Sequence, residues 1–214
     1  MEQNKNIPVN GAGNVDLTAL FRIGYGLYVI TARAGGRDNG MIGNAVMQVT
    51  NTPNRIAVCI NKAAYTHDLV KESGVMNLNC LTQNAPFSVF QHFGFQSGQE
   101  VDKFADLTPL RAQNGVAVLS EHSNAYISLA VEQYIDLDTH GMFICTVSEA
   151  RVLSDAPSVT YDYYQKNIKP RPQKPPVKGY VCRVCGWVYE GESLPEDIEC
   201  PICHHGAADF EPMR

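Results

Sequence analysis

The sequence predicts a mostly β protein of two domains: a barrel with short helices, and a small domain built on metal-binding cysteine knuckles. Three observations lead to this prediction. Residues 15–165 contain many strand-sized apolar segments, residues 166–178 are rich in proline and cations, and residues 179–214 hold four of the seven cysteines. We therefore expect a first domain at 1–165, a linker at 166–178 and a second domain at 179–214.

Composition excludes several classes of protein. Of the 214 residues, 44% are hydrophobic and 18% are charged, which is typical of a folded globular chain. The apolar runs are strand-sized and none approaches the ~20 residues that a membrane-spanning helix needs. The net charge of -5 argues against a nucleic-acid surface, and residues 1–13 lack the apolar stretch of a secretory leader. We expect a cytoplasmic protein that binds neither nucleic acid nor membranes.

Alternating and β-branched patterns fill the first domain. They predict strands at 25–33, 41–50, 55–61, 75–81, 125–137 and 142–153, with short helices at 16–21, 66–72 and 86–93. The segment between the first two strands ends in Asn39-Gly40, a dipeptide typical of hairpin turns. Cys59, Cys80 and Cys145 fall on strand patterns, where cysteine packs as a small hydrophobic residue.

The predicted linker has little apolar surface to bury. It contains four prolines, five cations and no aromatic residue, and such a composition favours an extended, solvated chain. The local charge is -5 before it, +5 within it and -5 after it, so a basic connector joins two acidic bodies. The alternative is a basic loop lying on the surface of a single domain.

The four C-terminal cysteines form two C-x2-C pairs separated by fourteen residues: Cys182, Cys185, Cys200 and Cys203. Four convergent thiolates suit tetrahedral iron or zinc, and the spacing does not choose between the two metals. A segment this short usually needs a metal or disulfides in order to fold. Two disulfides are the alternative here, but they would require an oxidising compartment, of which the sequence gives no sign.

The residues around these cysteines resemble the rubredoxin family. The likeness covers residues 179–214 and includes Gly186, Pro201 and four aromatic residues: Tyr180, Trp187, Tyr189 and Phe210. It favours one iron ion over a structural zinc. Rubredoxins usually have glycine after the fourth cysteine, where this chain has His204, and a non-glycine residue there would need an unfavourable positive φ. We expect His204 and His205 to be exposed, because four thiolates already complete the tetrahedron.

Polar residues follow two neighbouring strands of the first domain. One strand ends at Gln48–Thr50, and the next is followed by Asn61-Lys62 and by a helix start at Thr66. Hydroxyl, amide and cationic groups beside a helix start could bind a phosphate. An ordinary turn with a helix cap is the alternative.

The order of these segments resembles the flavin reductase family, which has an FMN-binding split-barrel fold. Four matches carry the resemblance from about 16 to 150: Val49-Thr50 before Pro53, Asn61-Lys62, the stretch Ser97–Phe104, and His140 with Phe143. The resemblance implies FMN as cofactor, NADH as hydride donor and a homodimer. It also implies flavin contacts from Asn44, Ala45, Val46, Gln48, Val49, Thr50, Asn61, Lys62, Thr66, His67, Ser97, Gly98 and Lys103.

The resemblance places His140 where the nicotinamide approaches, as the candidate catalytic residue. The alternative is a histidine exposed at a strand end beside Gly141. For Lys103 the sequence slightly favours another role, pairing with Asp102 on a helix surface.

Together the two domains resemble the high-molecular-weight rubredoxin family. That resemblance implies an enzyme in which FMN takes a hydride from NAD(P)H and passes single electrons to the iron-tetrathiolate centre. The acceptor would be another protein, a flavodiiron protein that reduces oxygen or nitric oxide. The alternative is a flavin- or haem-binding split-barrel module with a structural zinc ribbon, used for binding or sensing.

Overall fold

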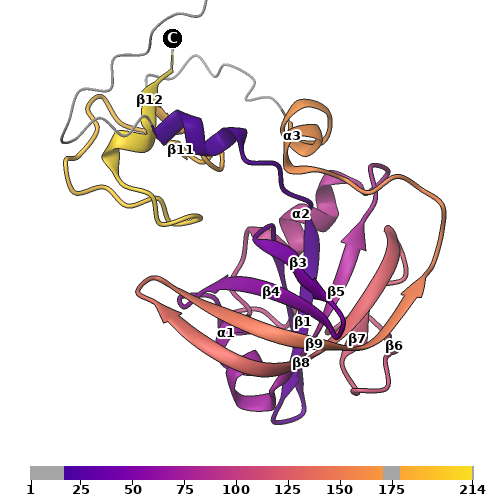
Figure 1. Ribbon diagram of the computed structural model, residues 1–214. Helices are drawn as coiled ribbons and strands as arrows, with labels where there is room; N and C mark the ends of the chain where they lie inside the picture. The colour runs from indigo at the N-terminus through magenta and orange to yellow at the C-terminus, as the bar shows by residue number, and fades with distance from the viewer. Residues whose placement is uncertain (1–16, 171–178, 214) are drawn as a thin grey trace, which may run out of the picture.

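A seven-stranded antiparallel sheet forms the first domain of the computed structural model, which describes residues 17–170 and 179–213 (Figure 1). The strand order is β2-β1-β5-β8-β9-β4-β3, which leaves β2 and β3 at the edges. The strands are β1 (Tyr28–Ala34), β2 (Arg37–Gly43), β3 (Val46–Asn51), β4 (Asn54–Asn61), β5 (Val75–Leu81), β8 (Ser123–Leu137) and β9 (His140–Val152). The predicted mostly β class is confirmed.

The sheet curls around an apolar core because inward-facing residues of neighbouring strands meet there. Val58, Leu129 and Phe143 are fully buried in this core, and α1 (Tyr65–Ser73) packs against it through its apolar side. A second cluster lies under α2 (Phe87–Gly94), where Phe90 contacts Tyr164 with ring centroids 4.5 Å apart. Tyr164 thereby fixes the segment that leads out of the barrel.

The β1–β2 turn differs from the prediction. Ala34 pairs with Arg37, so Gly35 and Gly36 make the turn, with φ of +55° and +81°. Glycine adopts positive φ without steric cost, and a two-residue hairpin needs it at both positions. The Asn39-Gly40 turn was therefore a wrong prediction, since both residues lie within β2.

The other predicted strands and helices lie within a few residues of their observed positions, except that one predicted strand is two strands in the structure. The predicted strand 41–50 is split between β2 and β3. The helix predicted at 16–21 is a 3-10 helix, η1 (Leu17–Arg22), and Asp16 lies outside the described residues. The sequence did not predict β6 (Leu110–Arg111), β7 (Ala117–Val118), α3 (Tyr161–Tyr163) or the π-helical turn η2 (Tyr164–Ile168).

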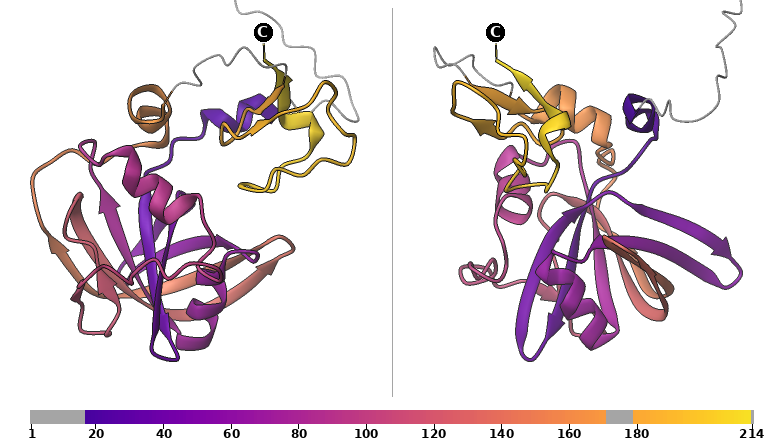
Figure 2. Two further views of the ribbon diagram at one scale, coloured as in Figure 1. Left: turned by 180° about the vertical axis from the view of Figure 1, so that it is seen from behind. Right: turned by 90° about the vertical axis from the view of Figure 1, so that its left-hand side faces the viewer.

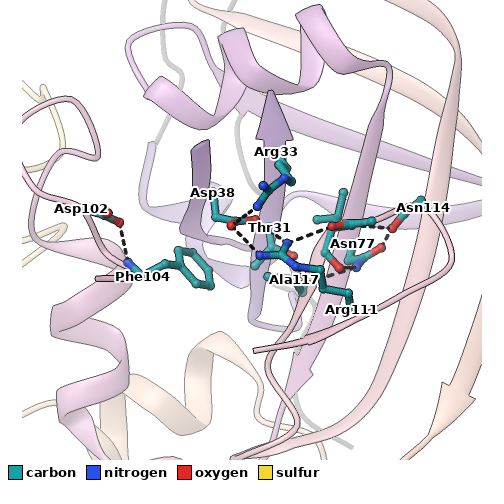
Figure 3. Close-up of polar contacts among 11 residues, drawn as sticks. Thr31, Arg33, Asp38, Asn77, Asp102, Phe104, Arg111, Asn114 and Ala117 are labelled. Carbon is teal, nitrogen blue, oxygen red and sulfur yellow. Dashed lines mark hydrogen bonds and ion pairs between the residues drawn. The ribbon is translucent and has the colours of Figure 1, made fainter. Parts of the chain in front are cut away.

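Polar contacts fasten the β6–β7 ribbon to the sheet (Figure 3). Asp38 accepts hydrogen bonds from Arg33 at 2.5 Å and from Arg111 at 2.9 Å. The buried Asn77 side chain donates to the carbonyls of Val116 and Ala117, at 3.0 and 3.2 Å. These bonds satisfy groups that would be costly to bury without partners.

Asp102 does not pair with Lys103. Its carboxylate accepts the amide of Phe104 at 2.9 Å (Figure 3), and residues 95–109 form turns and bends with no helix. The predicted Asp102–Lys103 pair on a helix surface is wrong, because this carboxylate stabilises its own turn while Lys103 is buried.

The second domain is a three-stranded sheet with the order β11-β10-β12. Its elements are β10 (Tyr180–Cys182), β11 (Val188–Tyr189), η3 (Ala207–Asp209) and β12 (Phe210–Pro212). Of the predicted linker 166–178, residues 171–178 lie outside the described part of the chain, and 166–168 belong to η2. Every helix in the described residues is too short or too polar to cross a lipid bilayer.

The three scattered cysteines are neutral thiols of the barrel. Cys145 is buried as predicted, whereas Cys59 and Cys80 are only half-buried. Burial raises the pKa of Cys80 to about 11 and that of Cys145 to about 12. Neither thiol is therefore poised as a nucleophile or metal ligand at neutral pH.

Candidate functional site

The second domain brings the four predicted cysteine ligands together. Their sulfur atoms all lie within 4.8 Å of one another, with Cys182 and Cys203 at 3.6 Å and Cys185 and Cys200 at 3.4 Å. Thiolates ~2.3 Å from a metal at the corners of a tetrahedron are about 3.8 Å apart. These four residues therefore fit a four-coordinate iron or zinc.

Two equivalent turns create this site. The amide of Gly186 donates to the carbonyl of Cys182, and the amide of His204 donates to that of Cys200, both at 2.8 Å. Both turns end in positive φ, +81° at Gly186 and +59° at His204. The expected strain at His204 is thus confirmed, as is the exposure of its side chain.

The sulfur atoms differ in exposure and in charge preference. Cys182 and Cys200 are fully buried, whereas Cys185 and Cys203 are partly exposed. The hydrogen bond between Cys185 and Cys203 lowers the pKa of Cys185 and raises that of Cys203, so the two sulfurs share a proton with the charge on Cys185. A thiolate is the form that binds a metal, so binding of a metal must displace the protons that the other sulfurs keep.

A cavity of about 740 Å³ lies between the two domains, within the ~300–1,000 Å³ usual for small-molecule sites. The barrel contributes β2, the start of α1 and the loop after α2, and the second domain contributes its second knuckle, from Pro201 to His204. Of the predicted flavin contacts, five line this cavity: Asn61, Thr66, Ser97, Gly98 and Lys103.

Asn39 also lines the cavity, and sequence reasoning missed it. Its amide nitrogen donates to the hydroxyl of Thr66 at 2.9 Å, while its buried Oδ1 has no hydrogen-bond partner in the described residues. A methyl group on Gly98 would lie 2.2 Å from this oxygen, so any larger residue there would displace the Asn39 side chain. A buried acceptor without a partner is costly unless a bound group supplies the donor. The sequence prediction placed Asn39 in a turn. It lies instead on β2, where its side chain is buried.

Lys103 brings a buried ammonium group to the cavity. It donates to the carbonyls of Gly40 and Phe93, at 2.9 and 3.0 Å, and the residue is 3% exposed. Burial lowers the pKa of Lys103 to about 8. An ammonium has three donors, so one remains for a bound group.

The α1 helix begins at this cavity without a side-chain cap. Ala64 is its N-cap residue and offers no side-chain acceptor, so the N–H groups of Tyr65 and Thr66 are available to an anion, whereas that of His67 donates to the carbonyl of Ala64. Together with Lys103 and the Asn39 oxygen, this arrangement fits a ligand that has both an anionic group and a hydrogen-bond donor. A flavin mononucleotide has both.

Six predicted contacts lie along β3 and just before it, outside the cavity. Asn44, Ala45 and Val46 are half-buried, whereas Gln48, Val49 and Thr50 are exposed on this edge strand. Figure 2 shows that the β3–β4 hairpin extends from the barrel to one side.

The remaining predicted residues surround the β8–β9 turn. Lys62 is ion-paired with Asp136, and His67 is buried, its Nε2 lying 3.2 Å from the hydroxyl of Tyr134. His140 pairs with Asn61 across β4 and β9, and partial burial lowers its pKa. The structure thus places His140 next to a cavity residue but His67 in the core.

Comparison with known proteins matches both domains. Residues 20–170 match the flavin reductase like domain, and residues 180–211 match the rubredoxin-like domain of rubrerythrin. The chain is 35% identical to the high molecular weight rubredoxin of Moorella thermoacetica, over 92% of this chain and 99% of that protein. It is 38% identical to the ferric-chelate reductase (NAD(P)H) of Archaeoglobus fulgidus, over 70% of this chain and 89% of that protein.

A solved structure shows the same barrel. The NADH:FAD oxidoreductase SgcE6 of Streptomyces globisporus superposes with a TM-score of 0.60 over 72% of this chain and 93% of that chain, at 18% identity. At this identity the likeness concerns the fold alone.

Proposed function

The chain belongs to the flavin reductase family and, over both domains, to the high-molecular-weight rubredoxins, and from this premise we propose that it is an NAD(P)H-dependent flavin/rubredoxin oxidoreductase. FMN, when bound, supplies the chemistry that accepts a hydride and gives up its two electrons singly. Cys182, Cys185, Cys200 and Cys203 hold one iron, which takes one electron at a time. The proposed acceptor is a flavodiiron protein, and the proposed location is the cytoplasm.

One observation supports this proposal most directly: Cys203 lines the same 740 Å³ cavity as the barrel residues. A flavin held in the cavity would lie beside a ligand of the iron. Electrons could then pass within one chain, without an encounter between two proteins.

We propose distinct roles for the residues that line the cavity. The N–H groups at the start of α1 and the hydroxyl of Thr66 bind the phosphate, since a helix N-terminus attracts anions. The free donor of Lys103 and the Oδ1 atom of Asn39 bind the polar edge of the flavin ring. Asn61, Ser97 and Gly98 complete the wall.

The exposed edge strand supports a homodimer. Met47 and Val49 on β3 are 64% and 41% exposed, and an uncovered strand edge invites pairing with another chain. We propose that a second copy covers this edge, where the predicted contacts Asn44–Val46 and Gln48–Thr50 complete the flavin site. Light scattering would contradict this if the FMN-loaded protein had a mass near the 23.6 kDa of one chain.

Lys62, His67 and His140 lie beyond the cavity wall, around the start of β9. We propose that Lys62, just before α1, and His67, in its first turn, support the phosphate end of the site. His140, next to Asn61, would face the approaching nicotinamide.

The test is anaerobic stopped-flow mixing with NADH, with flavin bleaching and iron reduction followed separately. Cys200→Ser should abolish iron reduction and leave flavin reduction nearly unchanged, because it removes a metal ligand alone. Cys80→Ala, which alters a half-buried thiol outside the cluster, serves as the matched control and should keep both signals. Iron reduction at an unchanged rate in full-length protein stripped of FMN would overturn the proposal.

A further inference from the structure

Lys169 is anchored to the barrel but reaches the metal domain. Its amide donates to the carbonyl of Tyr164 at 2.9 Å, and the buried Tyr164 ring packs against Phe90. Its side chain, however, lies against Gly186 in the first knuckle. A methyl group built on Gly186 would be 3.0 Å from Cε and 3.1 Å from Nζ of Lys169.

This contact places an ammonium group beside the metal ligands. Gly186 directly follows Cys185, and Lys169 lines a second cavity, of about 200 Å³, together with Cys185 and Cys203. Burial lowers the pKa of Lys169, and the sulfurs of Cys185, Cys182 and Cys203 oppose that effect electrostatically. Within residues 17–170 and 179–213, no carboxylate forms an ion pair with Lys169. Its charge is therefore directed at the thiolate site.

We infer that Lys169 raises the reduction potential of the iron held by these cysteines. This inference rests on the proposed function, because it requires iron in the site. Four thiolates around ferric iron carry one net negative charge, and around ferrous iron they carry two. A nearby cation stabilises the second state more than the first.

The step itself is a one-electron reduction of ferric to ferrous iron. The electron comes from the reduced flavin of the proposed function, no iron–sulfur bond breaks and no proton is required. Because coupling between two equilibria is reciprocal, reduction must also strengthen the contact between Lys169 and the knuckle. The electron would thus be accepted more readily while the two domains are in contact.

The test compares Lys169→Met, Lys169→Arg and Lys166→Met in the full-length, iron-loaded protein. Lys166 offers a matched control, since it lies three residues earlier, its side chain is 69% exposed, and it pairs with Asp162 instead of the metal site. The midpoint potential is read from iron absorption during a reductive titration with mediators. We expect Lys169→Met to make ferrous iron less favourable by roughly tenfold, which is ~59 mV for one electron. Lys169→Arg and Lys166→Met should stay close to the wild type.

An unchanged potential in Lys169→Met, or an equal shift in Lys166→Met, would overturn the inference. Salt provides an independent measurement, because 1 M salt reduces the screening length to ~3 Å. The wild-type potential should fall toward that of Lys169→Met as NaCl rises, and an identical salt dependence in both proteins would also refute the role of the charge. Iron absorption of the wild type is recorded first: native protein with zinc and no iron would refute the proposed function, whereas iron with no shift would refute only the role of Lys169.

Discussion

The barrel and the metal domain have cores of different composition. Among the described residues, the first cluster of the barrel contains twelve buried side chains, whereas that of the metal domain contains three: Cys182, Cys200 and Phe210. Two of those three are metal ligands. The barrel can therefore obtain its stability from apolar burial, whereas the metal domain depends on the bonds that its sulfurs make. In the proposed function, the same four side chains would hold the electron carrier and support the fold of the domain.

Metal removal should give the largest difference between the two domains. We expect a chelator to unfold residues 179–213 while the barrel stays folded, because metal-binding free energy is folding free energy in such a small domain. Trp187 is the only tryptophan and lies in the metal domain, so its fluorescence reports this domain alone. Hydrogen exchange in β4 and β9 reports the barrel. An unchanged Trp187 spectrum in metal-free protein would contradict this dependence.

A core truncation in the barrel should have the opposite effect: it should destabilise the barrel and leave the metal domain unchanged. Phe143 is fully buried and packs against Tyr134 and His67, with ring centroids 5.1 and 5.5 Å away. Phe143→Ala should reduce the free energy of unfolding of the barrel by about 3–5 kcal/mol, as measured by urea denaturation. Absorption of the metal site should not change. Leu110→Ala, at a residue that is 62% exposed, is the control and should stay within about 0.5 kcal/mol of the wild type.

Sequence patterns predicted the structure best at positions where a single physical requirement determines it. The cysteine spacing predicted the ligand cluster, because four thiolates in two turns can converge in few ways. β5 was predicted at its observed bounds, since its alternating apolar residues lie between Gly74 and a polar segment. The resemblance to the two-domain family is confirmed by 35% identity along nearly the whole chain.

The errors arose where two signals compete or where distant segments meet. Gly35-Gly36 and Asn39-Gly40 both suit a hairpin, and only the pairing register decides between them. Asn39 was missed for that reason. Lys103 follows a carboxylate, which suggests a local pair, yet its partners are carbonyls ten and 63 residues away in the chain. The contact of Lys169 with Gly186 depends on how two domains meet, which a local pattern does not encode.

A smaller effect is expected at the strained knuckle of the metal domain. His204 has a φ of +59°, a conformation that costs an L-residue roughly 1–2 kcal/mol and glycine almost nothing. His204→Gly should therefore slow metal loss to a chelator by several-fold, although it removes a hydrogen bond to Glu199 at the surface. His205→Gly is the matched control, because His205 is also exposed but lacks a positive φ. Faster metal loss in His204→Gly than in His205→Gly would show that the side chain matters more than the strain.

The smallest expected effect is a pH dependence confined to the barrel. Burial lowers the pKa of Lys103 to about 8 in the folded protein, against 10.5 for an ordinary lysine. Between these values the unfolded chain binds more protons than the folded one, so the free energy of unfolding rises with pH. Below pH 8 both states keep the proton, and the contribution of Lys103 is constant.

We expect the free energy of unfolding of the flavin-free wild-type barrel, measured relative to that of Lys103→Met, to increase between about pH 8 and 10.5. Tyrosine and cysteine also titrate in this range, but they are present in both proteins and cancel in the difference. Parallel curves would mean that the two carbonyl hydrogen bonds hold the proton on Lys103 despite its burial, and that the cavity keeps its positive charge at alkaline pH.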